Sequence, residues 1–142
     1  MGKLTKEAAD ILNERFGKDN VIALATVDAG KPAVRYVNAF YQDRAFYVIT
    51  YGLSGKIRQI TENPAISIAG DWFTAKGTGK NLGWVGAPEN ESIFSTLREA
   101  FSEWIDNGHN DFSDRNTCIL KLELEEGVLF SHGTRYEIDF TA

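Results

Sequence analysis

Residues 21–63 read VIALATVDAGKPAVRYVNAFYQDRAFYVITYGLSGKIRQITEN, and this stretch decides the fold. Alternating side chains and two turn-forming clusters predict three consecutive strands, at 20–28, 33–41 and 45–51. A short helix over 54–62 is expected next, and Asn63-Pro64 ends it. No helix separates the three strands, so they are expected to pair as antiparallel hairpins and not as a parallel α/β sheet.

The polar residues of this stretch fall where an anion could be held. Arg35 lies inside the second strand, Thr50 and Tyr51 end the third, and Ser54-Gly55-Lys56 opens the helix. An arginine on a strand that faces a helix N-terminus with a hydroxyl and an ammonium group is an arrangement that binds phosphate.

Each of these residues also has a purely structural interpretation. Arg35 could pair with Asp28 or Asp43 on a solvated face, Ser54 could serve only as a helix cap, and Lys56 could be solvated. Together the three favour the anion site, because charge-assisted hydrogen bonds to phosphate use such groups in combination. Arg58, further along the helix, is expected at the surface.

The rest of the chain adds more short strands and two longer helices. An amphipathic helix is expected at 3–16, and an apolar stripe predicts another at 89–107. Strands are expected at 65–73 and 117–124, with a final hairpin from 128–131 and 135–140. The glycine-rich segment 74–85 is either a bulged strand or a loop. Many short strands and few helices predict a mainly β protein, an antiparallel barrel or sandwich.

Composition limits the possible classes. With 142 residues, 43% of them hydrophobic, the chain is expected to form one domain over 1–142, and no apolar run is long enough to cross a membrane. The N-terminus lacks the apolar core of a secretory signal, and a single cysteine allows no internal disulfide, so a cytoplasmic protein is expected. Net charge is −5, although residues 21–60 hold five basic side chains against two acidic ones. This balance argues against nucleic acid as a partner and leaves room for one small anion.

Other reactive residues give no recognisable site. Cys118 alternates with apolar residues and is expected in the core, while His109 and His132 lie in predicted turns. This spacing gives no metal site and no acid–base pair, so catalytic residues stay unassigned. Residues 76–80, KGTGK, lack the spacing of a nucleotide triphosphate loop. The aromatic side chains between Trp72 and Trp84 are expected to pack in the core or at an interface rather than to stack on a ligand.

Two segments together resemble a known family. ALATVDAGKPAVRYVNAF (23–40) and AFYVITYGLSGKIRQITENPAISI (45–68) are similar to the pyridoxamine 5′-phosphate oxidase-like FMN-binding split barrels. The shared pattern is a strand of small residues, a Gly-x-Pro turn, a strand bearing Arg, a strand ending in Thr, a helix start with Ser and Lys, and an Asn-Pro stop. The resemblance is specific over residues 20–70 and rests on the order of elements from 71 to 142.

The resemblance implies a six-stranded antiparallel split β-barrel with flanking helices, which forms a homodimer and binds FMN in two clefts at the subunit interface. It implies that Arg35, Ser54 and Lys56 hold the FMN phosphate, and that the strand edge at Tyr36, Val37 and Asn38 contacts the isoalloxazine ring. Thr50 and Tyr51 would line the phosphate and ribityl end. The segment between Trp72 and Trp84 is a further candidate for contacts from the partner subunit.

Three functions are compatible with these residues. The first is an FMN-dependent oxidoreductase whose electron donor and substrate the sequence does not identify. Oxidation of pyridoxamine phosphate itself is disfavoured, because true enzymes of that type carry a C-terminal segment with basic substrate ligands, and here the final eight residues hold only Arg135. The second is a flavin carrier or sensor without turnover, or a relative that binds haem or the deazaflavin F420. The third is a stress-response or interaction protein whose ligand site is vestigial.

Overall fold

The computed structural model describes residues 1–108 and 110–142, so the prediction for His109 lies outside the described residues. Within these described ranges, eight strands join one sheet in the order β1-β8-β7-β4-β3-β2-β5-β6, and β6 also pairs with β7. That last pairing closes six antiparallel strands into a barrel, with β1 and β8 added outside it. The predicted six-stranded split barrel is confirmed.

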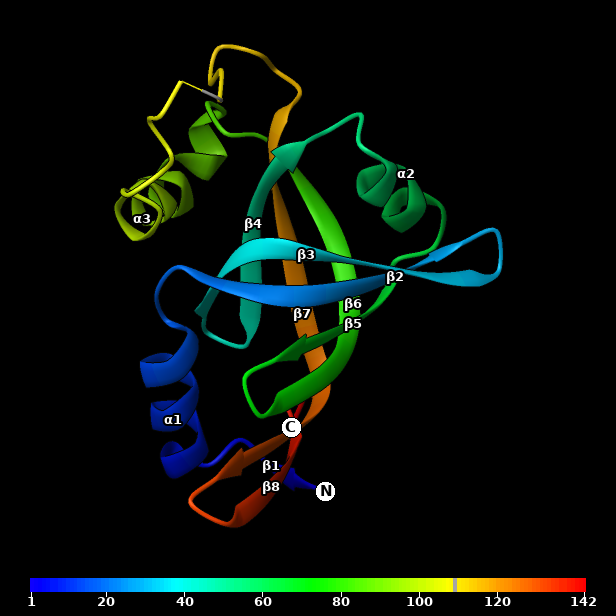
Figure 1. Ribbon diagram of the computed structural model, residues 1–142, viewed down its shortest axis with the longest axis vertical. Coiled ribbons are helices and arrows are strands. Elements are labelled where there is room, and N and C mark those ends of the chain that lie inside the picture. The colour runs from blue at the N-terminus through cyan, green and yellow to red at the C-terminus, as the bar shows by residue number, and fades with distance from the viewer. Residues whose placement is uncertain (109) are drawn as a thin grey trace.

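The barrel strands are β2 (Asn20–Asp28), β3 (Lys31–Gln42), β4 (Ala45–Tyr51), β5 (Ala65–Gly70), β6 (Phe73–Trp84) and β7 (Thr117–Ser131). The additional strands are β1 (Gly2–Lys3) and β8 (Thr134–Asp139), and the helices are α1 (Lys6–Phe16), α2 (Gly55–Glu62) and α3 (Glu91–Ala100), the last preceded by a 3-10 turn at Pro88–Asn90. Helix α2 separates the fourth and fifth strands of the chain, and helix α3 separates the sixth and seventh (Figure 1).

Two apolar clusters hold these elements together. The larger fills the barrel, where Phe16 of α1 packs against Phe46 and Phe73 at ring-centroid distances of 5.6 Å. The smaller lies beneath α3, where Leu97, Phe101 and Ile105 pack on the outward side chain of Ile119. Each fully buried Leu or Phe side chain contributes about 1.5–3 kcal/mol, which accounts for a stable barrel without a disulfide. Cys118 is buried, as predicted, and burial raises the pKa of its thiol.

Several predicted boundaries are wrong for identifiable reasons. The first helix begins at Lys6 and not at residue 3, because the hydroxyl of Thr5 caps it and Gly2–Lys3 pair with β8 instead. The strand expected at 65–73 is two strands: β5 ends at Gly70 and a turn at Trp72, with φ of 52°, starts β6.

The later elements are also corrected. Of the two alternatives for segment 74–85, residues 74–84 form the bulged strand, as part of β6 with register shifts at Lys76/Gly77 and Asn81/Gly83. The strand at 117–124 and the first arm of the expected last hairpin are one strand, β7. The helix expected at 89–107 ends at Ala100, and its apolar stripe continues through consecutive turns, in which Phe101 and Ile105 stay buried.

Candidate anion-binding site at the split of the barrel

The barrel is parted along one edge of β3. Strand β2 pairs with β3 from Lys31 to Ala39, whereas β4 pairs only with Phe40, Tyr41 and Gln42. In the described part of the chain, no strand therefore pairs with the second edge of β3 between residues 31 and 39. Helix α2 begins beside this open edge, after the end of β4 (Figure 1).

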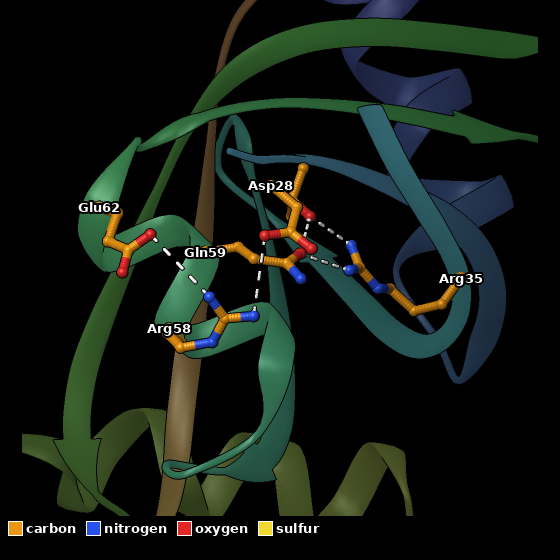
Figure 2. A network of polar contacts seen from close by, with 6 residues as sticks. Asp28, Arg35, Arg58, Gln59 and Glu62 are labelled. Carbon is orange, nitrogen blue, oxygen red and sulfur yellow. Dashed lines mark hydrogen bonds and ion pairs between the residues drawn. The ribbon is translucent and has the colours of Figure 1, made fainter. Parts of the chain in front are cut away.

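Arg35 lies in this open segment and points to the inner face of the sheet, as does its cross-strand neighbour Leu24. Its Nη1 donates to the carbonyl oxygen of Leu24 at 3.1 Å and to Thr26 Oγ1 at 2.8 Å, and its Nη2 donates to Gln59 Oε1 at 2.8 Å. Thr26 in turn donates to Gln59 Oε1 at 2.6 Å. Figure 2 shows the guanidinium held from β2 and α2. These contacts give the side chain one orientation.

The carboxylates considered as partners of Arg35 are engaged elsewhere. Asp28 forms an ion pair with Arg58 at 3.8 Å, and Arg58 also reaches Glu62 at 4.0 Å (Figure 2). Asp43 lies in the β3–β4 turn, at the other end of the strand. Burial lowers the pKa of Arg35 and the charge of Asp28 raises it, so Asp28 acts on the guanidinium at a distance. Arg58 is more than half exposed, as expected.

The start of α2 carries two more polar groups, Ser54 and Lys56, and Lys56 lies close enough to Arg35 for their charges to interact. Ser54 is the N-cap by backbone conformation, but its hydroxyl makes no capping bond, and its buried oxygen has no hydrogen-bond partner among the described residues. Lys56 Nζ donates to Thr50 Oγ1 at 2.8 Å. Burial first, and then the charge of Arg35, lower the pKa of Lys56. We call Arg35, Ser54 and Lys56 the anion site.

This arrangement is suited to a negatively charged group. Two cations that repel each other lie beside the first turn of a helix, whose N–H groups have no acceptor within the helix. An orphaned buried hydroxyl at the same point costs free energy until a ligand satisfies it. A phosphate would neutralise the two cations, accept hydrogen bonds from the helix N–H groups and give the hydroxyl a partner. The residues therefore fit the phosphate of FMN.

The neighbouring residues of β3 face in different directions. Tyr36 is 81% exposed on the outer face, while the Val37 side chain is buried and leaves only its backbone at the open edge. Asn38 is exposed, and its Nδ2 donates to Asp19 Oδ1 at 3.0 Å. Asp19 Oδ2 also accepts the indole N–H of Trp104 at 2.9 Å. The residues after α3 are thus connected to β3 at Asn38, near one end of its open edge.

Thr50 and Tyr51 are the last two residues of β4, before the chain enters α2. Thr50 is the hydrogen-bond partner of Lys56, and Tyr51 leaves about half of its surface exposed. The structure therefore brings Thr50 together with the anion site and places Tyr51 at its outer rim.

Sequence reasoning missed the two residues that support Arg35. Thr26 and Gln59 are 2% and 7% exposed, respectively. A signal was present in each case, since Thr26 follows the inward positions Ile22 and Leu24, and Gln59 lies between the buried Ile57 and Ile60. A polar residue on an apolar face calls for a buried partner.

The remaining candidates lie away from the anion site. Trp72 is 71% exposed on the β5–β6 turn, whereas Phe73 is in the core and Trp84 packs on the smaller cluster. His132 is exposed in the β7–β8 turn at φ of 50°. Residues 76–80 are part of β6 and form no phosphate loop. Among the described residues, no group of three His, Cys, Asp or Glu is placed to hold a metal ion.

Two cavities lie elsewhere on the molecule, among the residues that the structure describes. One of about 550 Å³ lies between α1 and the β7–β8 turn, and one of about 470 Å³ is lined by β2, β5, β6 and β7. Of the residues around Arg35, only Thr26 contributes to either lining. The anion site thus belongs to an open edge and not to these cavities.

A six-stranded barrel in which one strand edge is left unpaired beside the start of a helix is a split β-barrel. Residues 4–129 match the family model described as pyridoxamine 5′-phosphate oxidase. The chain therefore belongs to the pyridoxamine 5′-phosphate oxidase-like FMN-binding split-barrel family, and the resemblance seen in the sequence is confirmed.

Solved structures agree on the fold at low sequence identity. A NimC/NimA family protein from Clostridium acetobutylicum is 18% identical with a TM-score of 0.67, over 91% of this chain and 92% of that one. An FAD-binding protein from Mesorhizobium loti is 17% identical with a TM-score of 0.61, over 84% and 91%. A pyridoxamine 5′-phosphate oxidase-related, FMN-binding protein from Nostoc punctiforme is 16% identical with a TM-score of 0.57, over 94% and 96%. No curated protein matches the sequence.

Proposed function

We propose that this protein binds FMN and acts as a flavin-dependent oxidoreductase, with the flavin held at the interface of a homodimer. The observation that carries the proposal is the anion site, where two cations and an unsatisfied buried hydroxyl surround the start of α2 beside an open strand edge. The solved relative named as FMN-binding supports the choice of flavin.

Each group has a task in this proposal. Arg35, Ser54, Lys56 and the first N–H groups of α2 hold the phosphate, and Thr50 and Tyr51 lie along the ribityl chain. The unpaired backbone edge at Tyr36, Val37 and Asn38 offers donors and acceptors to the ring. FMN, when bound, supplies the hydride or electron transfer, so that the chain needs to bind and orient it and exclude water. The electron donor and the substrate remain to be identified.

The homodimer is supported by the outer face of β2 and β3. Three side chains on this face, Val21, Val34 and Tyr36, are between 57% and 81% exposed, and the small residues Ala23 and Ala25 lie between them. Exposed apolar side chains gathered on one face are typical of a protein–protein interface.

In the described part of the chain, no helix has the length and apolar character of a membrane span. The single, buried cysteine is compatible with residence in the cytoplasm.

The first test is the double variant Arg35→Ala/Lys56→Ala. Loss of two charge-assisted contacts should weaken FMN binding at least a hundredfold, measured by quenching of flavin fluorescence. Lys6→Ala is the control, because it removes an exposed cation of α1 whose ion pair is with Asp10, and it should bind FMN within about threefold of the parent. An unchanged FMN affinity in the double variant would mean that the phosphate lies elsewhere.

The second test asks whether the bound flavin turns over. Native mass spectrometry of the purified protein identifies the bound molecule, and stopped-flow absorbance with NADH or NADPH follows its reduction. Reduction followed by reoxidation with an acceptor supports the oxidoreductase. A bound flavin that neither nucleotide reduces supports the carrier or sensor.

A further inference from the structure

Gln59 makes contacts that fix the orientation of its own amide group. Both Arg35 and Thr26 donate to its Oε1, and a guanidinium can only donate, so the amide oxygen must face them. The side chain is 7% exposed, and it comes from the same helix whose start forms the anion site. A buried glutamine that accepts two hydrogen bonds is costly to rotate, because turning the amide would place N–H against N–H.

The acceptors around Arg35 share one property, which is that all are neutral. They are the Leu24 carbonyl, the Thr26 hydroxyl and the Gln59 amide oxygen. Neutral dipoles orient a guanidinium without cancelling its charge, whereas a carboxylate at the same place would form an ion pair and remove most of its attraction for a phosphate. The nearby carboxylate of Asp28 is engaged by Arg58, as Figure 2 shows.

The pattern of bonds also determines which donors stay available. The hydrogen bonds found among the described residues use both N–H groups of Nη1 and one of Nη2. The Nε–H and the second Nη2–H take no part in them. Two donors of one guanidinium suit two oxygens of one phosphate.

From these contacts we infer that Gln59, assisted by Thr26, is a positioning residue that aims Arg35 at the ligand phosphate while leaving its charge intact. The inference rests on the proposed function, since it requires that a phosphate binds at Arg35. It assigns a role to a residue that would not itself touch the phosphate.

The decisive variant is Gln59→Glu, which keeps the shape of the side chain and replaces the neutral acceptor by a carboxylate. Arg35 should stay in place as an ion pair, while the affinity for FMN falls about ten- to a hundredfold. Riboflavin, which has the same ring and no phosphate, should bind as it does to the parent. The salt dependence of FMN binding should also become shallower, because the site has lost net positive charge.

Gln59→Met and Thr26→Val are the companion variants, since each removes an acceptor of Arg35 without adding charge. Each should weaken FMN binding by a smaller factor than Gln59→Glu, with riboflavin again unaffected. Far-ultraviolet circular dichroism and a thermal melt check folding, and Thr26→Val carries the test if the Gln59 variants do not fold.

The outcomes separate the two proposals. Gln59→Glu that binds FMN as tightly as the parent overturns the role of Gln59, provided that Arg35→Ala weakens binding. An equal loss of FMN and riboflavin affinity in Gln59→Glu also overturns it, because the residue would then merely support the fold. A parent protein that binds riboflavin as well as FMN contradicts the proposed phosphate site itself.

Discussion

At the scale of single residues, the positive charge of Lys56 should favour anion binding but makes the ligand-free fold less stable. Its ammonium is partly buried, its pKa is lowered by burial and by Arg35, and its hydrogen-bond partner is the neutral hydroxyl of Thr50. A lysine whose pKa is lower in the fold than in the unfolded chain makes folding less favourable while it is protonated. That penalty is present at neutral pH and is relieved as pH rises from the lowered pKa towards 10.5. The protonated Lys56 therefore lowers the stability of the ligand-free protein.

Lys56→Met should separate these two effects. Methionine keeps the unbranched apolar stem and removes the charge, so the ligand-free protein should unfold at a slightly higher temperature, by roughly 1–5 °C. Binding of FMN should weaken at least tenfold in the same protein. Thermal melts without flavin and fluorescence titrations with it measure the two changes. A variant that is both less stable and unaltered in FMN binding would contradict this account.

The same residue predicts how binding depends on pH. Because the pKa of Lys56 is lowered, the affinity for FMN should begin to fall at a pH below 10.5, as the ammonium loses its proton. Lys56→Arg keeps its charge at alkaline pH and should hold its affinity over the same range. Titrations with FMN between pH 7 and 10.5, with riboflavin as the reference, give both curves. Parallel curves for the two proteins would exclude Lys56 as the titrating group.

At the scale of elements, the seam between β6 and β7 determines whether the barrel closes. The register of this pair shifts between Lys76 and Gly77, where the backbones approach closely. A β-carbon at Gly77 would collide with the backbone carbonyl of Glu123, which belongs to the facing strand and has no room to move. Closure of the barrel therefore requires glycine at position 77, because of this close approach and not because of a positive φ.

Gly77→Ala should destabilise the protein by about 1–3 kcal/mol, the usual range for overpacking, and more if the seam opens. Gly2→Ala is the matched control, because a β-carbon there meets no atom within 4 Å and its stability should change by less than about 0.5 kcal/mol. Urea denaturation of both variants measures the difference. Equal stability of the two proteins would show that the backbones part at little cost.

Sequence patterns predicted the elements well where burial alternates, and less well where it does not. Strand β2 was placed at its true bounds because small and large side chains alternate along it, and β4 because turn-forming residues and a helix start flank it. The helix at 89–107 was extended too far, since Phe101 and Ile105 keep a helical spacing although the chain there forms consecutive turns. The turn at Trp72 was missed because a bulky residue seldom adopts positive φ.

The candidate site was predicted in part. Position along the chain sufficed to place Arg35 on a strand and Ser54 and Lys56 at a helix start, and Arg35 contacts that helix through Gln59, while their role in binding a ligand stays a prediction. The contribution of Gln59 and the tie from Asn38 through Asp19 to Trp104 depend on contacts between residues up to 85 positions apart, which local patterns do not encode.

At the scale of the whole molecule, the outer face of β2 and β3 predicts the assembly. Val34→Glu places a charge in the middle of this exposed apolar face, opposite Ala25, and should dissociate the proposed dimer into monomers. FMN binding should weaken with it if the partner completes the site. Analytical ultracentrifugation and flavin titration at equal protein concentration test both expectations.

Trp72→Glu is the comparison for this prediction, because Trp72 is also exposed and apolar but lies on the β5–β6 turn. It should remain dimeric if β2 and β3 form the interface. Dissociation of the Trp72 variant, together with a dimeric Val34 variant, would move the interface to the β5–β6 turn and revive the contribution expected from residues 72–84.

The open edge of β3 should also affect the solubility of the protein when no ligand is bound. A row of unpaired backbone groups attracts any other extended chain, and such edges are the usual starting points of aggregation. A flat ring system and a second subunit laid along this edge would shield it. Cells starved of riboflavin should therefore yield more of this protein as insoluble material than cells supplied with the vitamin, so that flavin supply governs how much of it survives.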